Sequence, residues 1–462
     1  MIRLFNAYFP VRTVCLGATE ALLAALAFLL ATVATMGTLD ASIALAYEQG
    51  LVKIAIVVGV FSLCMYYFDL YDALILSNQR EAFIRLVQVF GTVCLLFAAF
   101  YYLFPSLRLD LGIFLIGLVL AVGEVALCRR VFLFMNTIDR FAEPCAILGN
   151  AALAKALLEQ FVTRPELGTR VVCQLSDDSI AAKGDCQSST WGEELKRVVE
   201  QNRIRRVIVA MGDQRGRLPV ETLLELKTEG VRVEDGVELY QSITGKISLH
   251  SLRLSWLVFS PGFQVSRLML VYKRLISLCL SIAGLLLMLP VMVVIAIAIR
   301  LDSAGPIIFR QKRVGKNGRI FTLYKFRSMI HDVEQDNNFK PACKDDSRIT
   351  RVGALLRRTR LDELPQLFNI LRGDMYFIGP RPFVPNQEEE CIRHIPFYKQ
   401  RWSVRPGATG WAQVNRDYCS TIEDNAEKLS YDLFYIKNVS VGLDLLILFK
   451  SMKILLLGRG GR

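Results

Sequence analysis

The chain has 462 residues, of which 53% are hydrophobic, and its formal net charge is +12. Its mean hydropathy of +0.37 is too high for an ordinary soluble protein of this size and indicates membrane segments. The eleven cysteines are odd in number and include no C-x-x-C pair, which argues against a zinc site or a disulfide framework.

Four apolar stretches occupy the first third of the chain, and each is near the ~20 residues that cross a bilayer as a helix. They are Val14–Met36, Leu51–Phe68, Phe83–Phe104 and Leu111–Phe134. Arginines flank the first, third and fourth stretches, whereas residues 38–50 carry acidic charges only. By the positive-inside rule, the N-terminus and everything after Arg130 are expected in the cytoplasm. We therefore predict a four-helix transmembrane region over residues 1–140, in which Glu20 and Glu124 are either functional or pack between helices.

Residues 141–246 change to an alternation of short strands and helices. Strands are expected at 145–149, 171–175, 206–210 and 231–234, with helices from Ala151, over 191–202 and over 219–229. This alternation predicts a small Rossmann-like α/β domain with a parallel sheet, so the expected fold class is membrane α-helical plus α/β. The first turn has one glycine, Gly149, where a dinucleotide fingerprint needs two or three. A structural, dimerising or ligand-sensing role is therefore favoured, and a homodimer is compatible with this large N-terminal region.

A linker over residues 247–266 leads to a fifth apolar stretch, Leu275–Ile299. As a straight helix its 25 residues would extend ~37 Å, which is enough to span a membrane. However, basic residues lie on both sides of it, and Pro290 inside it removes a backbone hydrogen bond and kinks the helix. We favour a re-entrant helix at about 270–299 that is broken at Pro290 and returns to the same face. The alternative is an ordinary span with a tolerated proline.

Nearly all of the excess positive charge lies between Gly262 and Arg462. No nucleic-acid-binding motif accompanies it, so we expect anionic membrane lipids or an anionic substrate as partners and no nucleic acid. Within this region, the sequence RRTRLDELPQ places Asp362 and Glu363 between an arginine cluster and a helix-forming segment. Carboxylates hold divalent metals or attack phosphorus, and guanidinium groups clamp phosphate. The pattern indicates phosphoryl chemistry, although on these residues alone Asp362 could equally be a helix N-cap.

Several blocks in this region resemble one protein family. They are Asp302–Gln311, Lys325–Met329, Asp362–Gln366, Gly379–Pro382, Arg405–Asn415 and Tyr431–Tyr435. Their sequence and order resemble the bacterial sugar transferases that load a hexose-1-phosphate onto polyprenyl phosphate, the monotopic phosphoglycosyl transferases. The preceding spans and α/β region resemble the larger, exopolysaccharide-associated members. The resemblance implies a catalytic domain over residues 267–462 that contains the re-entrant helix; many relatives have a serine where this chain has Leu289.

The resemblance also implies a reaction. Sugar-1-phosphate passes from a UDP-sugar to undecaprenyl phosphate through a covalent phosphosugar-aspartate intermediate, and UMP leaves, as the first membrane step of exopolysaccharide synthesis. Asp362 matches the family's nucleophile, and Glu363 matches the second acid, which is expected to act with Mg²⁺. Mg²⁺ suits such a site because it binds through few carboxylates plus substrate phosphate. The expected location is the bacterial inner membrane, multi-pass, with the catalytic domain on the cytoplasmic face.

Six basic residues are candidates for substrate binding: Lys325, Arg327, Arg357, Arg358, Arg360 and Arg381. Lys325 and Arg327 bind phosphate or only face lipid headgroups, and at most two of the three arginines before Asp362 should reach one substrate. Arg381 lies between two prolines, which holds it stiffly; a solvated turn arginine is the alternative. Two other functions stay open, a non-enzymatic scaffold of a polysaccharide assembly complex and a membrane-bound nucleotide-sugar-modifying enzyme. No motif in the sequence identifies the sugar.

Overall fold

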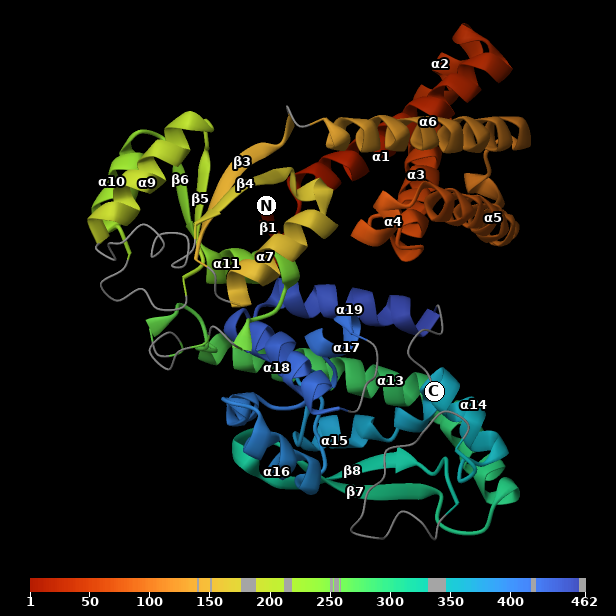
Figure 1. Ribbon diagram of the computed structural model, residues 1–462. Coiled ribbons are helices and arrows are strands. Elements are labelled where there is room, and N and C mark those ends of the chain that lie inside the picture. The colour runs from red at the N-terminus through yellow and green to blue at the C-terminus, as the bar shows by residue number, and fades with distance from the viewer. Residues whose placement is uncertain are drawn as a thin grey trace. The chain divides into compact units, whose positions relative to one another are not determined.

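A computed structural model of the chain (Figure 1) describes residues 1–138, 141–149, 152–175, 188–211, 218–249, 252, 257, 259–330, 346–416 and 421–456. The contacts divide the chain into two units. Unit 1 comprises Met1–Ile2 and Tyr8–Leu239, and unit 2 comprises Arg3–Ala7 and Tyr240–Arg462. The finer division that the sequence suggested, with boundaries near residues 140, 246 and 266, stays a prediction.

Long apolar helices of unit 1 match the four predicted stretches. They are α1 (Val11–Met36), α3 (Gly50–Tyr67), α5 (Gln79–Leu103) and α6 (Leu111–Thr137), and each is long and apolar enough to cross a membrane. Shorter elements join them, namely α2 (Thr38–Tyr47), α4 (Ala73–Ser77) and the 3-10 turn η1 (Pro105–Leu107). Helix α5 begins earlier than predicted because the Asn78 side chain caps it, accepting a hydrogen bond from the Glu81 N–H at 3.2 Å.

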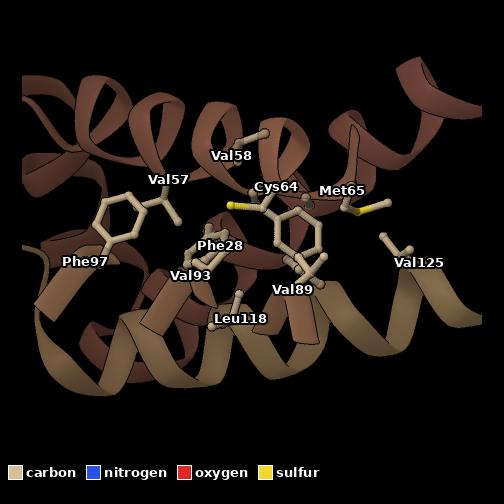
Figure 2. Packing of buried hydrophobic residues seen from close by; sticks show 14 of the residues in the cluster. Phe28, Val57, Val58, Cys64, Met65, Val89, Val93, Phe97, Leu118 and Val125 are labelled. Carbon is tan, nitrogen blue, oxygen red and sulfur yellow. The ribbon is translucent and has the colours of Figure 1, made fainter. Parts of the chain in front are cut away.

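The helices of this bundle close around a shared hydrophobic core (Figure 2). Phe28 of α1, Val57 of α3, Phe97 of α5 and Leu118 of α6 are all buried in it. Helices α1 and α6 approach closely at Gly117, where an added Cβ would lie 2.4 Å from Phe28 Cδ1. The absence of a side chain at this position therefore determines how closely the two helices pack.

An ion pair also joins α1 and α6 inside the bundle. Arg129 Nε lies 2.7 Å from Glu20 Oε1, and Arg129 Nη2 donates to Glu20 Oε2 at 3.1 Å. Both residues are buried. Because a buried charge needs a partner, this geometry gives Glu20 a helix-packing role, which was one of the two alternatives for this acid.

Unit 1 also contains the predicted parallel sheet. Its strands are β3 (Glu143–Leu148), β4 (Thr169–Leu175), β5 (Arg206–Val209) and β6 (Arg232–Asp235), paired in the order β4-β3-β5-β6. Helices α9 (Ser188–Gln201) and α10 (Val220–Thr228) cover one face and α7 (Ala152–Thr163) covers the other (Figure 1). The turn η3 (Pro165–Leu167) precedes β4. Successive side chains of β3 point to opposite faces of the sheet, and residues 145–148 are all buried. Because both faces of the sheet are covered, these four residues form a continuous apolar run.

The single glycine after β3 has a packing explanation. Gly149 has φ +117°, and a Cβ there would lie 2.7 Å from the Ala210 carbonyl oxygen at the end of β5. The glycine is therefore required by the neighbouring strand, whatever the turn binds. The predicted helix start at Ala151 lies outside the described residues.

Unit 2 contains the remaining elements. After α11 (Gly236–Thr244) they are α13 (Arg267–Asp302), the antiparallel hairpin β7 (Ile308–Val314) and β8 (Ile320–Phe326) with η5 (Lys316–Gly318) between them, α14 (Arg351–Thr359), η7 (Leu361–Glu363), α15 (Gln366–Arg372), β9 (Tyr376–Ile378), α16 (Pro385–His394), η8 (Tyr398–Ser403), β10 (Gly407–Thr409), α17 (Trp411–Asn415), α18 (Ile422–Lys437) and α19 (Val441–Leu456). Strand β9 pairs in parallel with β10. At the N-terminus, β1 (Ile2–Leu4) pairs with β2 (Ala7–Phe9).

Helix α13 continues through Pro290, so the predicted break at this proline is wrong. Proline removes one N–H, and the turns on both sides keep their helical hydrogen bonds. Both ends of α13 bind the same short stretch of chain. Near its start, Arg274 donates to the Ile370 and Leu371 carbonyl oxygens at 2.7 Å each, and at its end Asp302 accepts a 3.0 Å hydrogen bond from the Val352 N–H. A bend and membrane re-entry stay predictions.

The tight packing at Gly117 can be tested with a matched pair on α6. Gly117→Ala should destabilise the bundle by about 1–3 kcal/mol, because the added methyl overlaps the buried Phe28 ring. Gly123→Ala should leave stability unchanged or raise it, because nothing in the described chain lies within 4 Å of its Cβ and alanine favours helix. Thermal unfolding of the purified chain in detergent measures both, and equal melting temperatures for the two variants would contradict the packing argument.

Candidate active site

The two predicted acids lie on the short 3-10 turn η7, between α14 and α15. The Thr350 side chain caps the start of α14 by accepting the Gly353 N–H at 2.9 Å, and the helix ends at Arg360, whose φ of 56° is left-handed. This reversal directs the chain into η7. No side chain caps either η7 or α15, whose N-cap is Pro365. Asp362 is therefore not a helix N-cap, and that alternative explanation of the residue is wrong.

Two cations from distant parts of unit 2 hold Glu363. Its Oε1 accepts hydrogen bonds from Lys325 Nζ at 3.0 Å and from Arg381 Nη2 at 2.5 Å. Lys325 comes from β8, and Arg381 comes from the turn after β9. Burial by itself would raise the pKa of Glu363, but Arg381 and Lys325 outweigh it and hold this pKa well below its usual range. Glu363 is therefore a fixed negative charge.

Asp362 has a different environment from its neighbour. Its side chain is 13% exposed, and Lys325 Nζ lies 3.9 Å from Asp362 Oδ2, which is too far for a hydrogen bond. Burial raises the pKa of Asp362 despite the opposing charge of Lys325, and the charge of Glu363 adds to this rise. Two adjacent acids whose environments separate their pKa values are typical of a divided catalytic role.

The predicted arginines before Asp362 do not share one environment. Arg357, in the last turn of α14, is close enough for its charge to oppose the rise in the pKa of Asp362. Arg358 is exposed, and Arg360 forms the left-handed end of α14. That at most two of the three reach one substrate, and which of them do so, stays a prediction.

Arg327 lies at the end of α13 and not at the acids. It is buried, and it donates to the carbonyl oxygens of Ser303 at 2.7 Å, Ala304 at 3.0 Å and Ile299 at 3.3 Å. Ser303 and Ala304 directly follow the last residue of α13, and the Ile299 carbonyl oxygen also accepts the Ser303 N–H at 3.2 Å, so Arg327 binds the backbone at the C-terminal end of the helix. The structure thus gives Arg327 a helix-capping role, which disfavours the phosphate contact that we predicted for it.

Sequence reasoning missed Asn369, which positions Lys325. The Asn369 side chain is fully buried on α15, accepts the Tyr324 N–H at 3.0 Å and donates to the Thr322 carbonyl oxygen at 2.7 Å. These two hydrogen bonds take the place of those that a neighbouring strand would make with the backbone of β8, next to Lys325. The signal was present in the sequence as an amide among the apolar residues of a short helix, since such a residue must find partners when buried.

Sequence reasoning also missed Arg401, which positions Arg381. The buried Arg401 guanidinium bonds to Asp432 Oδ2 at 2.8 Å, Glu388 Oε1 at 3.3 Å and the Arg381 carbonyl oxygen at 2.8 Å. It also lies 4.5 Å from the Phe383 ring centroid. Asp432 lies in the Tyr431–Tyr435 block that resembles the family. Through Arg401, it supports the turn that carries Arg381.

The Arg401 cluster should contribute strongly to stability. Arg401→Gln leaves two buried carboxylates without their cation, and we expect a loss of about 3–5 kcal/mol. The matched control is Arg393→Gln on α16, whose ion pair with Glu389 is mostly exposed and should be worth less than about 1 kcal/mol. Chemical unfolding of both variants checks this, and similar losses for the two would show that the buried cluster is not a special source of stability.

Comparison with known proteins identifies relatives of this region and of longer parts of the chain. Residues 268–458 match the family model described as bacterial sugar transferase. The UDP-N-acetylgalactosamine-undecaprenyl-phosphate N-acetylgalactosaminephosphotransferase of Aeromonas hydrophila is 41% identical over 228 residues, which cover 49% of this chain and 52% of that protein.

Two glucose-1-phosphate transferases align over more of the chain. The UDP-glucose:undecaprenyl-phosphate glucose-1-phosphate transferase of Escherichia coli (strain K12) is 35% identical, covering 66% of each chain. The enzyme of the same name from Klebsiella pneumoniae is 33% identical over 337 residues, 71% of this chain and 70% of its own length. The matched part thus spans about half to somewhat over two thirds of these relatives. The chain belongs to the bacterial sugar transferase family.

Proposed function

We propose that the chain transfers sugar-1-phosphate from a UDP-sugar to undecaprenyl phosphate, with release of UMP. The observation that carries this proposal is the pair of unlike acids: Glu363 is clamped by Lys325 and Arg381, while Asp362 is buried beside the same cations and Lys325 Nζ lies 3.9 Å from its Oδ2, too far for a hydrogen bond. The printed names of the relatives attach UDP-sugars and undecaprenyl phosphate to those proteins, which supports the same substrate classes here. The names of these relatives specify different sugars, so we assign no particular sugar to this chain.

The chemistry follows from the environment of Asp362. Its carboxylate oxygen attacks the β-phosphorus of the UDP-sugar, the bond from that phosphorus to the bridging oxygen breaks, and UMP leaves with the electron pair. A phosphosugar-aspartate remains. An oxygen of the lipid phosphate then attacks the same phosphorus, the bond to Asp362 breaks, and the lipid-linked diphosphate sugar forms. Lys325, Arg357 and Arg381, whose charges all act on Asp362, attract the diphosphate and stabilise the charge that develops on it.

The acids present fit Mg²⁺ as the family's metal. Among the described residues, no group of three or more metal-ligating side chains gathers anywhere. Mg²⁺ does not need one, since it is commonly held by one or two carboxylates plus substrate phosphates. Asp362 and Glu363 would hold the ion, which when bound neutralises charge on the transferring phosphoryl group. A zinc site, which needs three or four protein ligands, does not fit this donor set.

We further propose that α13 re-enters the membrane and that the site rests on the cytoplasmic face of the bacterial inner membrane. Support comes from the two ends of α13, which hydrogen-bond to Val352 and to Ile370–Leu371. The chain between these contacts carries Asp362, Glu363 and several arginines, and so polar a segment cannot cross ~30 Å of hydrocarbon. Both ends of α13 therefore belong on one side, where a soluble nucleotide sugar and a membrane lipid meet.

We propose that the parallel sheet of unit 1 is a Rossmann-like domain with a structural role. Its strand order supports the fold. Because packing against Ala210 accounts for Gly149, this glycine gives no support to a pyrophosphate site, which counts against a nucleotide-sugar-modifying enzyme. The scaffold alternative leaves the clamped acid pair without a purpose. A homodimer stays a prediction.

Replacement of the nucleophile tests the reaction. Asp362→Asn keeps the size of the side chain but removes the attacking oxygen charge, so UMP release should fall at least ~10³-fold. The assay uses the purified chain in nanodiscs with Mg²⁺, undecaprenyl phosphate and a panel of UDP-sugars. The control is Glu389→Gln, an exposed acid of α16, which should retain full activity. Undiminished UMP release from a folded Asp362→Asn variant would remove Asp362 from the mechanism.

The acid side of the pH profile should report Asp362. Because burial raises its pKa, kcat/KM should fall below an apparent pKa higher than the ordinary aspartate value of about 3.9. Glu363 stays ionised through this range because its pKa is lowered. Glu363→Gln removes a negative charge that raises the pKa of Asp362, so the acid limb of the residual activity should move to lower pH. An upward shift of that limb contradicts the assignment.

A further inference from the structure

A cavity lies between α5 and α6 of unit 1, apart from the site described above. Its volume is about 330 Å³. Its wall is mostly apolar and includes Phe83 and Leu86 of α5 and Ala126 and Leu127 of α6. Gly123 makes room for it, because nothing in the described chain lies within 4 Å of a Cβ built there. The cavity is therefore an apolar slot in a bundle whose helices are long enough to cross a membrane.

The polar lining residues gather at one end of this slot. Gln79 begins α5, and Arg129 and Arg130 lie near the end of α6, whereas Gly123 lies further from that end. The rise along α6 from Gly123 to Arg130 is ~10 Å at ~1.5 Å per residue, and Leu133 lies further along the helix. That is less than the ~15 Å of one leaflet, which is half of the ~30 Å hydrocarbon core of a bilayer. The slot thus fits within one leaflet, with its arginines toward the side of the C-terminal end of α6.

The charges at this end select the kind of headgroup. Arg129 is compensated, because it is paired with Glu20 and donates to the Leu70 carbonyl oxygen at 2.8 Å. Arg130 is exposed, and in the described part of the chain no carboxylate pairs with it. The slot therefore offers one uncompensated positive charge. A singly charged phosphodiester matches it better than a phosphate monoester, which carries nearly two negative charges at neutral pH, or a zwitterionic headgroup.

We propose that this cavity binds an anionic phospholipid, with an acyl chain along Phe83, Gly123 and Leu127 and a phosphodiester headgroup at Arg130. The lipid would occupy the leaflet on the side of the Arg130 end of α6. This inference concerns the bundle alone and is independent of the transfer reaction proposed above, because none of its residues belongs to unit 2.

Native mass spectrometry of the full chain tests the proposal, with phosphatidylglycerol and phosphatidylcholine as the probe lipids. Arg130→Gln should weaken phosphatidylglycerol binding roughly fivefold, the effect of one cation near a lipid surface. Gly123→Leu should remove the tightly held lipid by filling the slot. Matched controls are Arg108→Gln, an exposed arginine at the opposite ends of α5 and α6, and Gly91→Leu, an open glycine of α5 outside the cavity. Both controls should bind like the parent chain.

Three outcomes would overturn the proposal. The first is unchanged phosphatidylglycerol retention in both Arg130→Gln and Gly123→Leu. The second is equal retention of phosphatidylcholine, which would show that charge plays no part. The third is preferential displacement by added undecaprenyl phosphate, which would assign the cavity to that lipid instead. Because Arg130 is exposed, its variant should unfold at the temperature of the parent chain, so a binding loss there is not a folding defect.

Discussion

The structure of unit 2 depends on how the charge of Glu363 is satisfied. A half-buried carboxylate directly beside a second carboxylate is stable only if cations surround it. Lys325 and Arg381 meet at one oxygen of Glu363, although they come from β8 and from the turn after β9. The strand, the turn and η7 must therefore be held together before either acid can function. Once they are, Asp362 is left as the acid without a hydrogen bond to Lys325.

Each member of this clamp is itself held by a buried polar side chain. Asn369 ties β8, and with it Lys325, to α15. Arg401 ties the backbone of Arg381 to α18 through Asp432. Buried polar networks stabilise one arrangement only when every member is satisfied, and here the partners are carbonyls, carboxylates and amides supplied by separate elements. The support of the site is therefore distributed over the unit, while its chemistry is confined to η7.

Arginine has several distinct uses in this chain, which explains why its charge alone was a poor guide to function. Arg274 and Arg327 bind backbone carbonyls near the two ends of α13, and Arg129 neutralises Glu20 inside the bundle. Arg130 is instead exposed beside an apolar cavity. A guanidinium group suits all of these positions because it presents five donors in a fixed plane. Only the partners that tertiary structure supplies distinguish a cap, a clamp and a ligand site.

The sequence by itself determined the apolar helices and the parallel sheet and singled out Asp362 and Glu363 as candidates, because hydropathy, strand–helix alternation and adjacent acids are local patterns. Tertiary structure alone decided that Arg327 caps α13, that the helix continues through Pro290, and that Asn369 and Arg401 support the clamp. These outcomes depend on partners distant in sequence, such as Glu363 with Lys325 and Arg401 with Asp432. A residue type limits which bonds a side chain can make, but the fold decides which partners lie within reach.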